Sequence, residues 1–124
     1  MSDCPFCTTH GVSLGEHWKL IKDKYPVTKG HHLLVPKRHV TKLTDLTKEE
    51  LAELGNCMKQ AFYCVKITSS CMDGFNIGLN NGVTAGQTVD HLHFHFIPRR
   101  DEDMEDPRGG VRAIFPEKRI YQND

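Results

Sequence analysis

The segment from His91 to Ile97 alternates histidine with apolar residues, and this pattern limits the possible folds of the chain strongly. Successive side chains of a β-strand point to opposite faces of its sheet. The alternation therefore predicts a strand over 89–97, ended by Pro98, with one face of imidazoles and one face in the core. The imidazoles belong to His91, His93 and His95, and the core residues are Leu92, Phe94 and Phe96.

A long helix is the clearest other element. Thr47 is a good N-cap residue, and Glu50, three residues later, completes a capping box. Apolar residues follow at helical spacing and predict one buried face: Leu51, Leu54, Met58, Ala61, Phe62 and Val65. Short strands are expected around this helix, at 17–22, 31–35, 75–79 and 111–115. Strands, one long helix and further strands indicate an α+β fold with a mainly antiparallel sheet of about five strands.

Length and charge restrict the organisation further. A chain of 124 residues predicts one domain over 1–124, with an irregular lead-in or short second helix over 1–16 and a carboxyl-terminal tail over 101–124. Sixteen basic and sixteen acidic residues give no net charge, which argues against a broad nucleic-acid surface. No apolar run approaches the roughly 18 to 20 residues of a membrane helix.

The cysteines and the amino terminus indicate a cytoplasmic protein. The first residues lack the basic stretch and apolar run of a signal peptide. Five cysteines are an odd number, which fits a reducing compartment better than a disulfide framework. Cys57, Cys64 and Cys71 recur every seven residues and are expected to fill the core as small thiols.

The alternating histidines allow two kinds of chemistry. His-x-His on a strand can present imidazoles to zinc, although three in a line spread over about 13 Å. Alternatively, one neutral imidazole attacks phosphorus while its other nitrogen donates to a fixed acceptor. Phosphorus attack also needs donors for the phosphate oxygens. Neutral donors lie in or beside the Gly- and Asn-rich loop just upstream, and they favour the phosphoryl interpretation: Asn80, Gln87 and Thr88.

The segment 86–99, GQTVDHLHFHFIPR, resembles the signature of the histidine triad (HIT) nucleotide hydrolases and transferases. Two distant segments support the resemblance. Residues 23–26 and 30–40 are similar to the family's nucleoside-binding strand, turn and strand with its Pro-Lys-x-His corner. Residues 75–80 are similar to the strand that leads into the phosphate loop. The likeness covers about residues 4–100 and implies a HIT-like fold.

The resemblance implies a role for each histidine of the triad. His93 matches the nucleophile, which attacks the α-phosphorus and forms a nucleotidyl-histidine that water hydrolyses. The backbone carbonyl of His91 would orient the His93 ring. His95 would bind phosphate oxygens with support from His31, the family's fourth histidine.

The nucleotide-binding residues also follow from the resemblance. Asn80, Gln87 and Thr88 match positions that contact the phosphate or the leaving group. Asp23 matches the position that binds the ribose hydroxyls, and a carboxylate can accept two hydroxyl protons. The base, adenine by analogy with the family, would be enclosed by Leu20, Ile21 and Leu33.

A second site is implied at the amino terminus. Cys4-x-x-Cys7 is by itself half a zinc site or a redox pair. Some relatives in the family complete a structural zinc site with two histidines, and the matching residues are His39 and His91. An empty thiol pair and a disulfide are the alternatives. Four protein ligands would leave no open position for substrate, so this zinc would be structural.

The leading hypothesis is therefore a hydrolase of dinucleoside polyphosphates or nucleoside phosphoramidates that acts through His93. Mg²⁺ can accompany a polyphosphate substrate, and the resemblance implies a homodimer. Three alternatives stay open: a nucleotidyl transferase or phosphorylase of the same family, a metallohydrolase with its metal on the three histidines, and a non-catalytic nucleotide-binding interaction protein.

Overall fold

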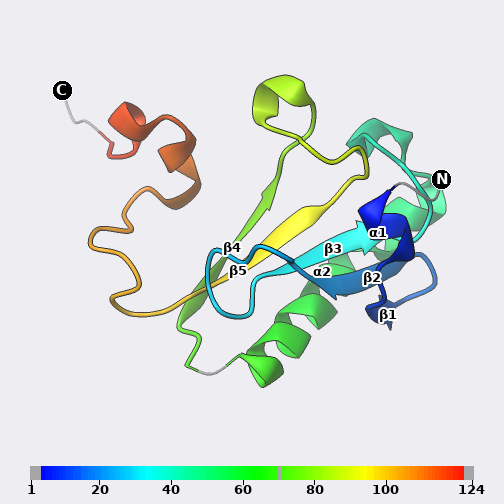
Figure 1. Cartoon of the computed structure of the whole chain (residues 1–124), viewed down its shortest axis with the longest axis horizontal. Helices are drawn as coiled ribbons and strands as arrows, with labels where there is room; N and C mark the ends of the chain where they lie inside the picture. The colour runs from blue at the N-terminus through cyan, green and yellow to red at the C-terminus, as the bar shows by residue number, and fades with distance from the viewer. Residues whose placement is uncertain (1–3, 70, 122–124) are drawn as a thin grey trace.

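The computed structural model describes residues 4–69 and 71–121, in which five strands form one antiparallel sheet in the order β1-β2-β3-β5-β4 (Figure 1). The strands are β1 (Val12–Leu14), β2 (Trp18–Lys22), β3 (His32–Pro36), β4 (Gly74–Leu79) and β5 (Phe94–Arg99). The helices are α1 (Pro5–Thr8) and α2 (Lys48–Thr68), with short 3-10 turns η1 (Leu43–Asp45), η2 (Val83–Ala85), η3 (Gly110–Ile114) and η4 (Pro116–Lys118). The predicted α+β fold with an antiparallel sheet and one long helix is confirmed.

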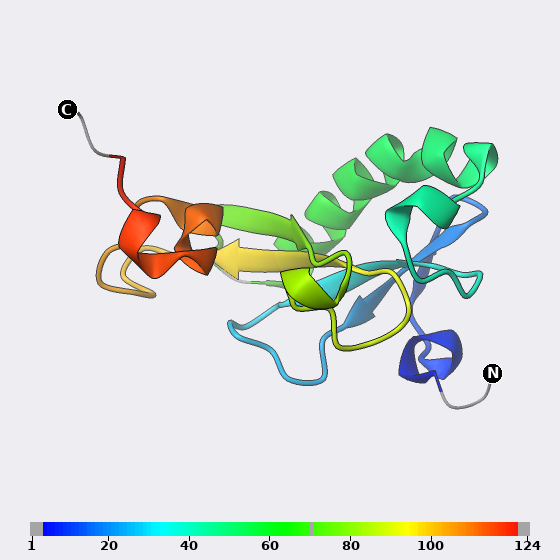
Figure 2. The same cartoon turned by 90° about the horizontal axis from the view of Figure 1, so that it is seen from above.

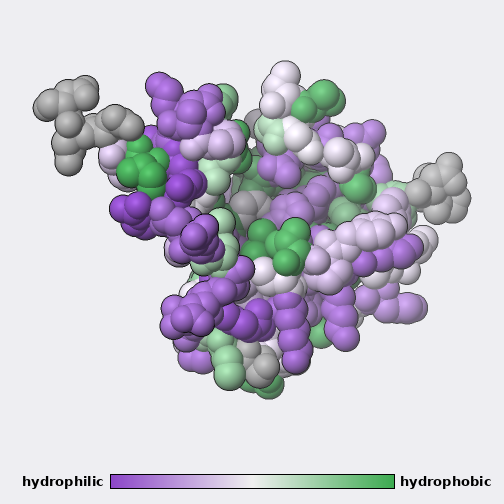
Figure 3. All heavy atoms as spheres, turned by 60° about the vertical axis from the view of Figure 1, so that its left-hand side comes forward, coloured by the Kyte–Doolittle hydropathy of each residue, from purple (hydrophilic) through white to green (hydrophobic). Residues whose placement is uncertain are grey.

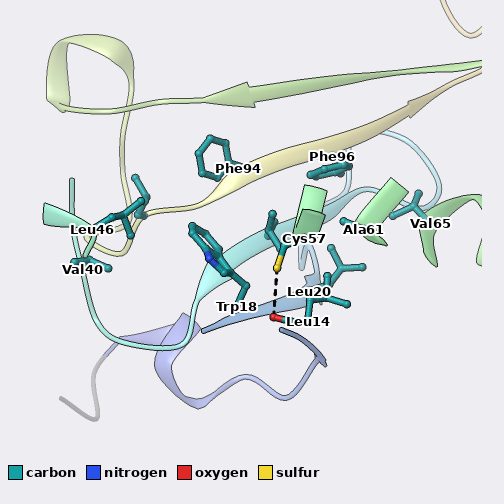
Figure 4. Packing of buried hydrophobic residues seen from close by; sticks show 12 residues of the cluster. Leu14, Trp18, Leu20, Val40, Leu46, Cys57, Ala61, Val65, Phe94 and Phe96 are labelled. Carbon is teal, nitrogen blue, oxygen red and sulfur yellow. Dashed lines mark hydrogen bonds between the residues drawn. The ribbon is translucent and has the colours of Figure 1, made fainter. Parts of the chain in front are cut away.

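The main core lies between α2 and one face of the sheet (Figures 2 and 4). Trp18 is fully buried there, and its indole N–H donates to the Glu50 carbonyl over 3.0 Å. Leu92, Phe94 and Phe96 belong to the same cluster, as their alternation with the histidines predicts. Burial of apolar side chains in such a cluster is the main contribution to the stability of a small domain.

The opposite face of the sheet carries a smaller cluster. Ile21, Leu33 and Val35 are buried on it, and Phe6 of α1 packs against them. Figure 2 shows α1 on the side of the sheet away from α2. Because β-strand side chains alternate, Leu20 points to the α2 face instead. Its expected place beside Ile21 and Leu33 around a base is therefore wrong.

Helix α2 begins where the sequence predicts, but the first residue of its buried face is Glu50 and not Leu51. The Thr47 hydroxyl accepts from the Glu50 N–H, and the Glu50 carboxylate accepts from the Thr47 N–H, so the capping box is present. Leu51 is 48% exposed because Glu50 takes the inward position of this turn, where it binds Arg38. Cys57 is buried and its thiol faces the Leu14 carbonyl.

The other two cysteines of the seven-residue series differ from one another. Cys64 is half-buried and packs against the core, as predicted. Cys71 is exposed and has a φ of 57°, so its prediction as a core thiol is wrong. The helix ends at Thr68, and the helical spacing that placed Cys71 on the buried face no longer applies beyond it.

The histidine strand is shifted along the chain from its predicted position. Strand β5 begins at Phe94, so His91 and His93 precede it and only His95 lies in the sheet. Residues before Phe94 leave the ladder, and the Leu92 N–H donates to the Val40 carbonyl over 2.7 Å instead. The strand also continues through Pro98, which pairs with Phe75 of β4. Strand β3 pairs with β5 only as far as Phe96, so Pro98 has a neighbouring strand on one side only. A proline is tolerated there because its missing N–H faces no second strand.

The two ends of the chain also differ from expectation. The lead-in contains both α1 and β1 in its described residues, and the strand expected at 111–115 is the 3-10 turn η3. Residues 1–3 and 122–124 of the predicted lead-in and tail lie outside the described residues. Within the described ranges, no helix has the length and apolar content to cross a membrane. The face in Figure 3 is largely hydrophilic, with hydrophobic residues in small groups.

Candidate active site

The site forms where β3 and β5 lie side by side on the face away from α2. Leu33 pairs with His95 in the register of these strands, and His31 lies directly before β3. His93 lies directly before β5. The antiparallel pairing thus brings together histidines that are more than sixty residues apart in the sequence.

His93 is held in one orientation by its neighbours. Its side chain is buried, and Nδ1 lies 2.8 Å from the backbone oxygen of His91. A carbonyl only accepts, so Nδ1 carries the proton and Nε2 of the neutral ring has a free lone pair. The rings of Phe6 and His95 lie edge-on to the His93 ring, with centroids 5.0 and 5.1 Å away.

His31 and His95 form a pair, and Asp23 lies beside it. His31 Nε2 lies 2.9 Å from His95 Nδ1 and 3.3 Å from the Asp23 carboxylate. Burial lowers the pKa of His31 despite the opposing effect of Asp23, and burial together with His93 and His31 lowers the pKa of His95. Both imidazoles are therefore neutral near pH 7. A neutral ring can donate one hydrogen bond and accept another without the cost of burying a charge.

A cavity of about 260 Å³ lies beside this pair. Asn80, at the end of β4, lines it together with His31 and His95. Its amide is thus placed where it can donate to an oxygen bound near His95. Of the predicted phosphate contacts, the structure brings Asn80 and His95 to one cavity.

Gln87 and Thr88 have different surroundings. The Gln87 side-chain oxygen accepts from the Gly82 N–H over 2.8 Å, and its amide nitrogen donates to the carbonyls of Thr41 and Val89, each over 3.1 Å. The side chain of Gln87 therefore fixes the conformation of the loop around η2 through its hydrogen bonds to the backbone. Thr88 lines a separate cavity of about 680 Å³ beside Cys4, Cys7 and His39.

The cysteines of the lead-in meet two histidines. Cys4 Sγ lies 3.3 Å from His91 Nδ1, and Cys7 Sγ lies 3.2 Å from His39 Nδ1 and 3.5 Å from His91 Nδ1. One ligand atom of each of the four residues lies within 4.8 Å of the others. Tetrahedral zinc with sulfur and nitrogen ligands separates those ligands by about 3.3 to 3.8 Å, so the donor set and spacing fit zinc.

The fully buried ring of His91 is held in place from the side away from the thiols. His91 Nε2 lies 2.8 Å from the Pro36 carbonyl, which keeps the proton on Nε2 and leaves Nδ1 to face the thiols. A ligating histidine commonly donates its other ring N–H in this way. The carbonyl of the same residue holds His93, so the possible metal site and the site around His93 share one residue.

Phe6 is a site residue that the sequence analysis missed. Its ring is edge-on to both His91 and His93. The signal was its position between Cys4 and Cys7, since a residue between two candidate ligands has to lie close to the place where they meet. The residue pattern alone did not place the lead-in against His93, because that contact depends on the folded path of the chain.

Comparisons with known proteins give the same family. The family model described as the HIT domain matches residues 9–102. The adenosine 5'-monophosphoramidase of Saccharomyces cerevisiae is 40% identical over 107 residues, which are 80% of this chain and 64% of that protein. The asymmetrical bis(5'-nucleosyl)-tetraphosphatase of Schizosaccharomyces pombe is 40% identical over 81 residues, 65% of this chain and 44% of that protein.

A solved structure of a relative has the same fold. The crystal structure of a zinc-bound histidine triad family protein from Mycobacterium smegmatis superposes with a TM-score of 0.70 at 32% identity, covering 85% of this chain and 81% of that one. The chain spans less than two thirds of the length of the two enzymes above. Because the family match covers most of the chain, it shows that this chain belongs to the HIT family, the histidine triad family.

Proposed function

We propose that the protein cleaves a nucleoside derivative at its α-phosphate through a covalent nucleotidyl-histidine on His93. The observation that carries the proposal is the hydrogen bond from His93 Nδ1 to the His91 carbonyl, which leaves Nε2 as a neutral nucleophile. The substrate class is a dinucleoside polyphosphate or a nucleoside phosphoramidate, in keeping with the activities named for the two enzyme relatives.

The reaction has two displacements. In the first, His93 Nε2 attacks the α-phosphorus, a P–N bond forms, and the bond to the leaving oxygen or nitrogen breaks as that group takes up a proton. In the second, water attacks the same phosphorus, the P–N bond to His93 breaks and a nucleoside monophosphate leaves. The His91 carbonyl stabilises the ring while it carries positive charge between the two steps.

The remaining polar groups bind the substrate in this proposal. His95 and Asn80 donate to the phosphate oxygens beside the cavity that they line. Asp23, 3.3 Å from His31, accepts from the ribose hydroxyls of a nucleoside, which adenosine would supply. Thr88 lies outside this cavity, and Gln87 acts through the loop, so their predicted contacts with phosphate need a change of loop conformation.

Zinc at Cys4, Cys7, His39 and His91 is the proposed structural cofactor. The supporting observations are the thiol and imidazole spacing, the hydrogen bond from His91 to Pro36 and the zinc-bound relative. Four protein ligands complete a tetrahedron, so the metal would hold the lead-in rather than bind substrate. Mg²⁺ would enter with a polyphosphate substrate, and the cytoplasmic homodimer stays a prediction.

The contacts of the triad also separate this proposal from a metallohydrolase. His91 faces the two thiols, His93 Nδ1 faces a carbonyl and His95 Nδ1 faces His31. The three rings thus point to three different partners and do not share one point. A phosphorylase differs from a hydrolase only in the acceptor of the second step, which is phosphate instead of water.

A substrate panel tests the proposal. The wild-type protein is incubated with adenosine phosphoramidate and with diadenosine polyphosphates, in the presence and absence of inorganic phosphate. We expect AMP from one class, and a loss of at least about a thousandfold in His93→Ala. His10→Ala, which removes an exposed histidine, is the matched control and should keep its activity. Activity of His93→Ala within tenfold of wild type would rule out the covalent route.

A further inference from the structure

The turn before β3 supplies a backbone donor to His31. The Val27 N–H donates to His31 Nδ1 over 3.1 Å. A backbone amide can only donate, so His31 Nδ1 has to accept and carries no proton. The single proton of the neutral His31 ring is then on Nε2.

The position of that proton determines the state of the next ring. His31 Nε2 faces His95 Nδ1 at 2.9 Å and the Asp23 carboxylate at 3.3 Å. Both of these partners can accept, and His31 has one N–H to donate to them. A proton on His95 Nδ1 would face the His31 N–H across 2.9 Å, so His95 Nδ1 presents its lone pair and accepts. The proton of the neutral His95 ring then lies on Nε2, the nitrogen that does not face His31.

The reverse arrangement has two conflicts. With a proton on His31 Nδ1, two N–H groups would face each other across 3.1 Å at Val27. With none on His31 Nε2, a lone pair would face the Asp23 carboxylate oxygen across 3.3 Å. Both conflicts fall on the buried ring of His31, so the reverse arrangement is disfavoured.

We propose that the Val27 backbone N–H sets the direction of a hydrogen-bond chain from Val27 through His31 to His95, so that His95 offers an Nε2–H donor to the substrate. This inference rests on the proposed function for the identity of that substrate, an α-phosphate whose oxygens accept from His95. Val27 is then a positioning residue that acts by its main chain, and its exposed side chain has no part in the chain of bonds.

The turn is anchored so that this amide stays in place. The Thr28 hydroxyl donates to the Pro98 carbonyl of β5 over 2.9 Å, and the His31 N–H donates to the Thr28 carbonyl over 3.1 Å. Gly30 has a φ of 91°, and a Cβ atom there would collide with the Ser69 side chain at the end of α2. The turn is thus tied to a strand on one side and packed closely on the other.

Nuclear magnetic resonance tests the direction of the chain in the wild-type protein without substrate. Long-range proton–nitrogen spectra of ¹⁵N-labelled protein assign the protonated nitrogen of each histidine. We expect Nε2–H for His31 and His95, and a scalar coupling through the hydrogen bond between the Val27 amide nitrogen and His31 Nδ1. A protonated Nδ1 on His31, or on His95, would overturn the proposal.

Two variants test the role of the amide itself. Val27→Pro removes the donor, and the two ¹⁵N shifts of His31 should move toward each other as the ring exchanges between tautomers. Val27→Ala keeps the amide and should leave both shifts in place. An unchanged His31 spectrum in folded Val27→Pro would overturn the proposal. If that variant does not fold, the coupling in the wild-type protein decides.

These readouts are separate from turnover. If His31 and His95 are both protonated on Nε2 but no nucleotide is cleaved, the proposed function is contradicted and the hydrogen-bond chain is supported. Cleavage through His93 with a protonated His31 Nδ1 would do the opposite. Because both are measured on the same labelled protein, the two failures can be told apart.

Discussion

His91 uses three of its atoms for three different partners. Its Nδ1 faces the cysteine thiols, its Nε2 lies 2.8 Å from the Pro36 carbonyl, and its own carbonyl binds His93. A shift of this residue would therefore change the proposed metal site and the orientation of the nucleophile together. Strand alternation could place His91 near His93, but it could not predict that the main chain of one histidine holds the ring of the other.

The buried carboxylate of Glu50 contributes to the stability of the fold. Two hydrogen bonds from Arg38, over 2.9 and 3.0 Å, lower the pKa of this buried carboxyl from 4.5 to about 2. A lowered folded-state pKa stabilises the protein above the unfolded value, and this stabilisation is lost as the pH falls from about 4.5 toward 2. Glu50→Gln should reduce the free energy of unfolding by about 2 kcal/mol at pH 7.

Urea unfolding between pH 7 and pH 3 checks this prediction. The difference in unfolding free energy between wild type and Glu50→Gln should shrink as the solution becomes more acidic. Glu49→Gln removes an exposed carboxylate from the same turn of α2 and should change the stability little. A constant difference across the pH range would contradict the assigned role of Glu50.

The loop between β4 and β5 depends on the side chain of Gln87. Gln87 bonds to two backbone groups of this loop, at Gly82 and Val89, and to the Thr41 carbonyl outside it. Gly82 and Gly86 have φ angles of 102° and 98°, which glycine adopts readily. Gln87→Glu would replace the donating amide with an oxygen that faces two carbonyls. The loop should open, and kcat/KM should fall by about tenfold to a hundredfold.

Kinetics on the substrate identified by the panel measure this effect. Gln60→Glu makes the same change of charge on the exposed side of α2 and serves as the control. Full activity of Gln87→Glu together with an unchanged loop would show that the hydrogen bonds of Gln87 do not hold the site.

Elements with local signals were predictable from the sequence, and elements that depend on distant contacts were not. The capping box at Thr47 and Glu50 involves neighbouring residues, so the start of α2 was correctly predicted. The beginning of β5 depends on the Leu92 N–H bonding to Val40, more than fifty residues away. Likewise, η3 replaced an expected strand because alternating apolar residues do not show whether a neighbouring strand is available.

The whole molecule is tied together by the contact between the lead-in and the centre of the chain. Cys4 and Cys7 reach His39 and His91, and Phe6 between them packs on the cluster formed by Ile21, Leu33 and Val35. Metal bound there would close a loop of more than eighty residues, which restricts the unfolded chain. The proposed zinc is thus expected to stabilise the whole fold.

Metal analysis and thermal unfolding measure this effect. We expect about one zinc per chain, and a strong chelator should lower the midpoint of unfolding and expose Cys4 and Cys7 to thiol reagents. Cys4→Ser should bind zinc weakly and unfold at a lower temperature, whereas Cys71→Ser, which changes an exposed thiol, should match wild type. Equal midpoints with and without metal would contradict a structural role.

The proposed reaction requires a covalent bond between His93 and the substrate. The most direct measurement is rapid quenching of the reaction into alkali, where phosphorus–nitrogen bonds to histidine survive, followed by mass spectrometry of the peptides. We expect a peptide that carries one added nucleoside monophosphate on His93 Nε2, present during turnover and absent once the substrate is exhausted. Turnover without any such peptide, or with the adduct on another residue, would contradict it.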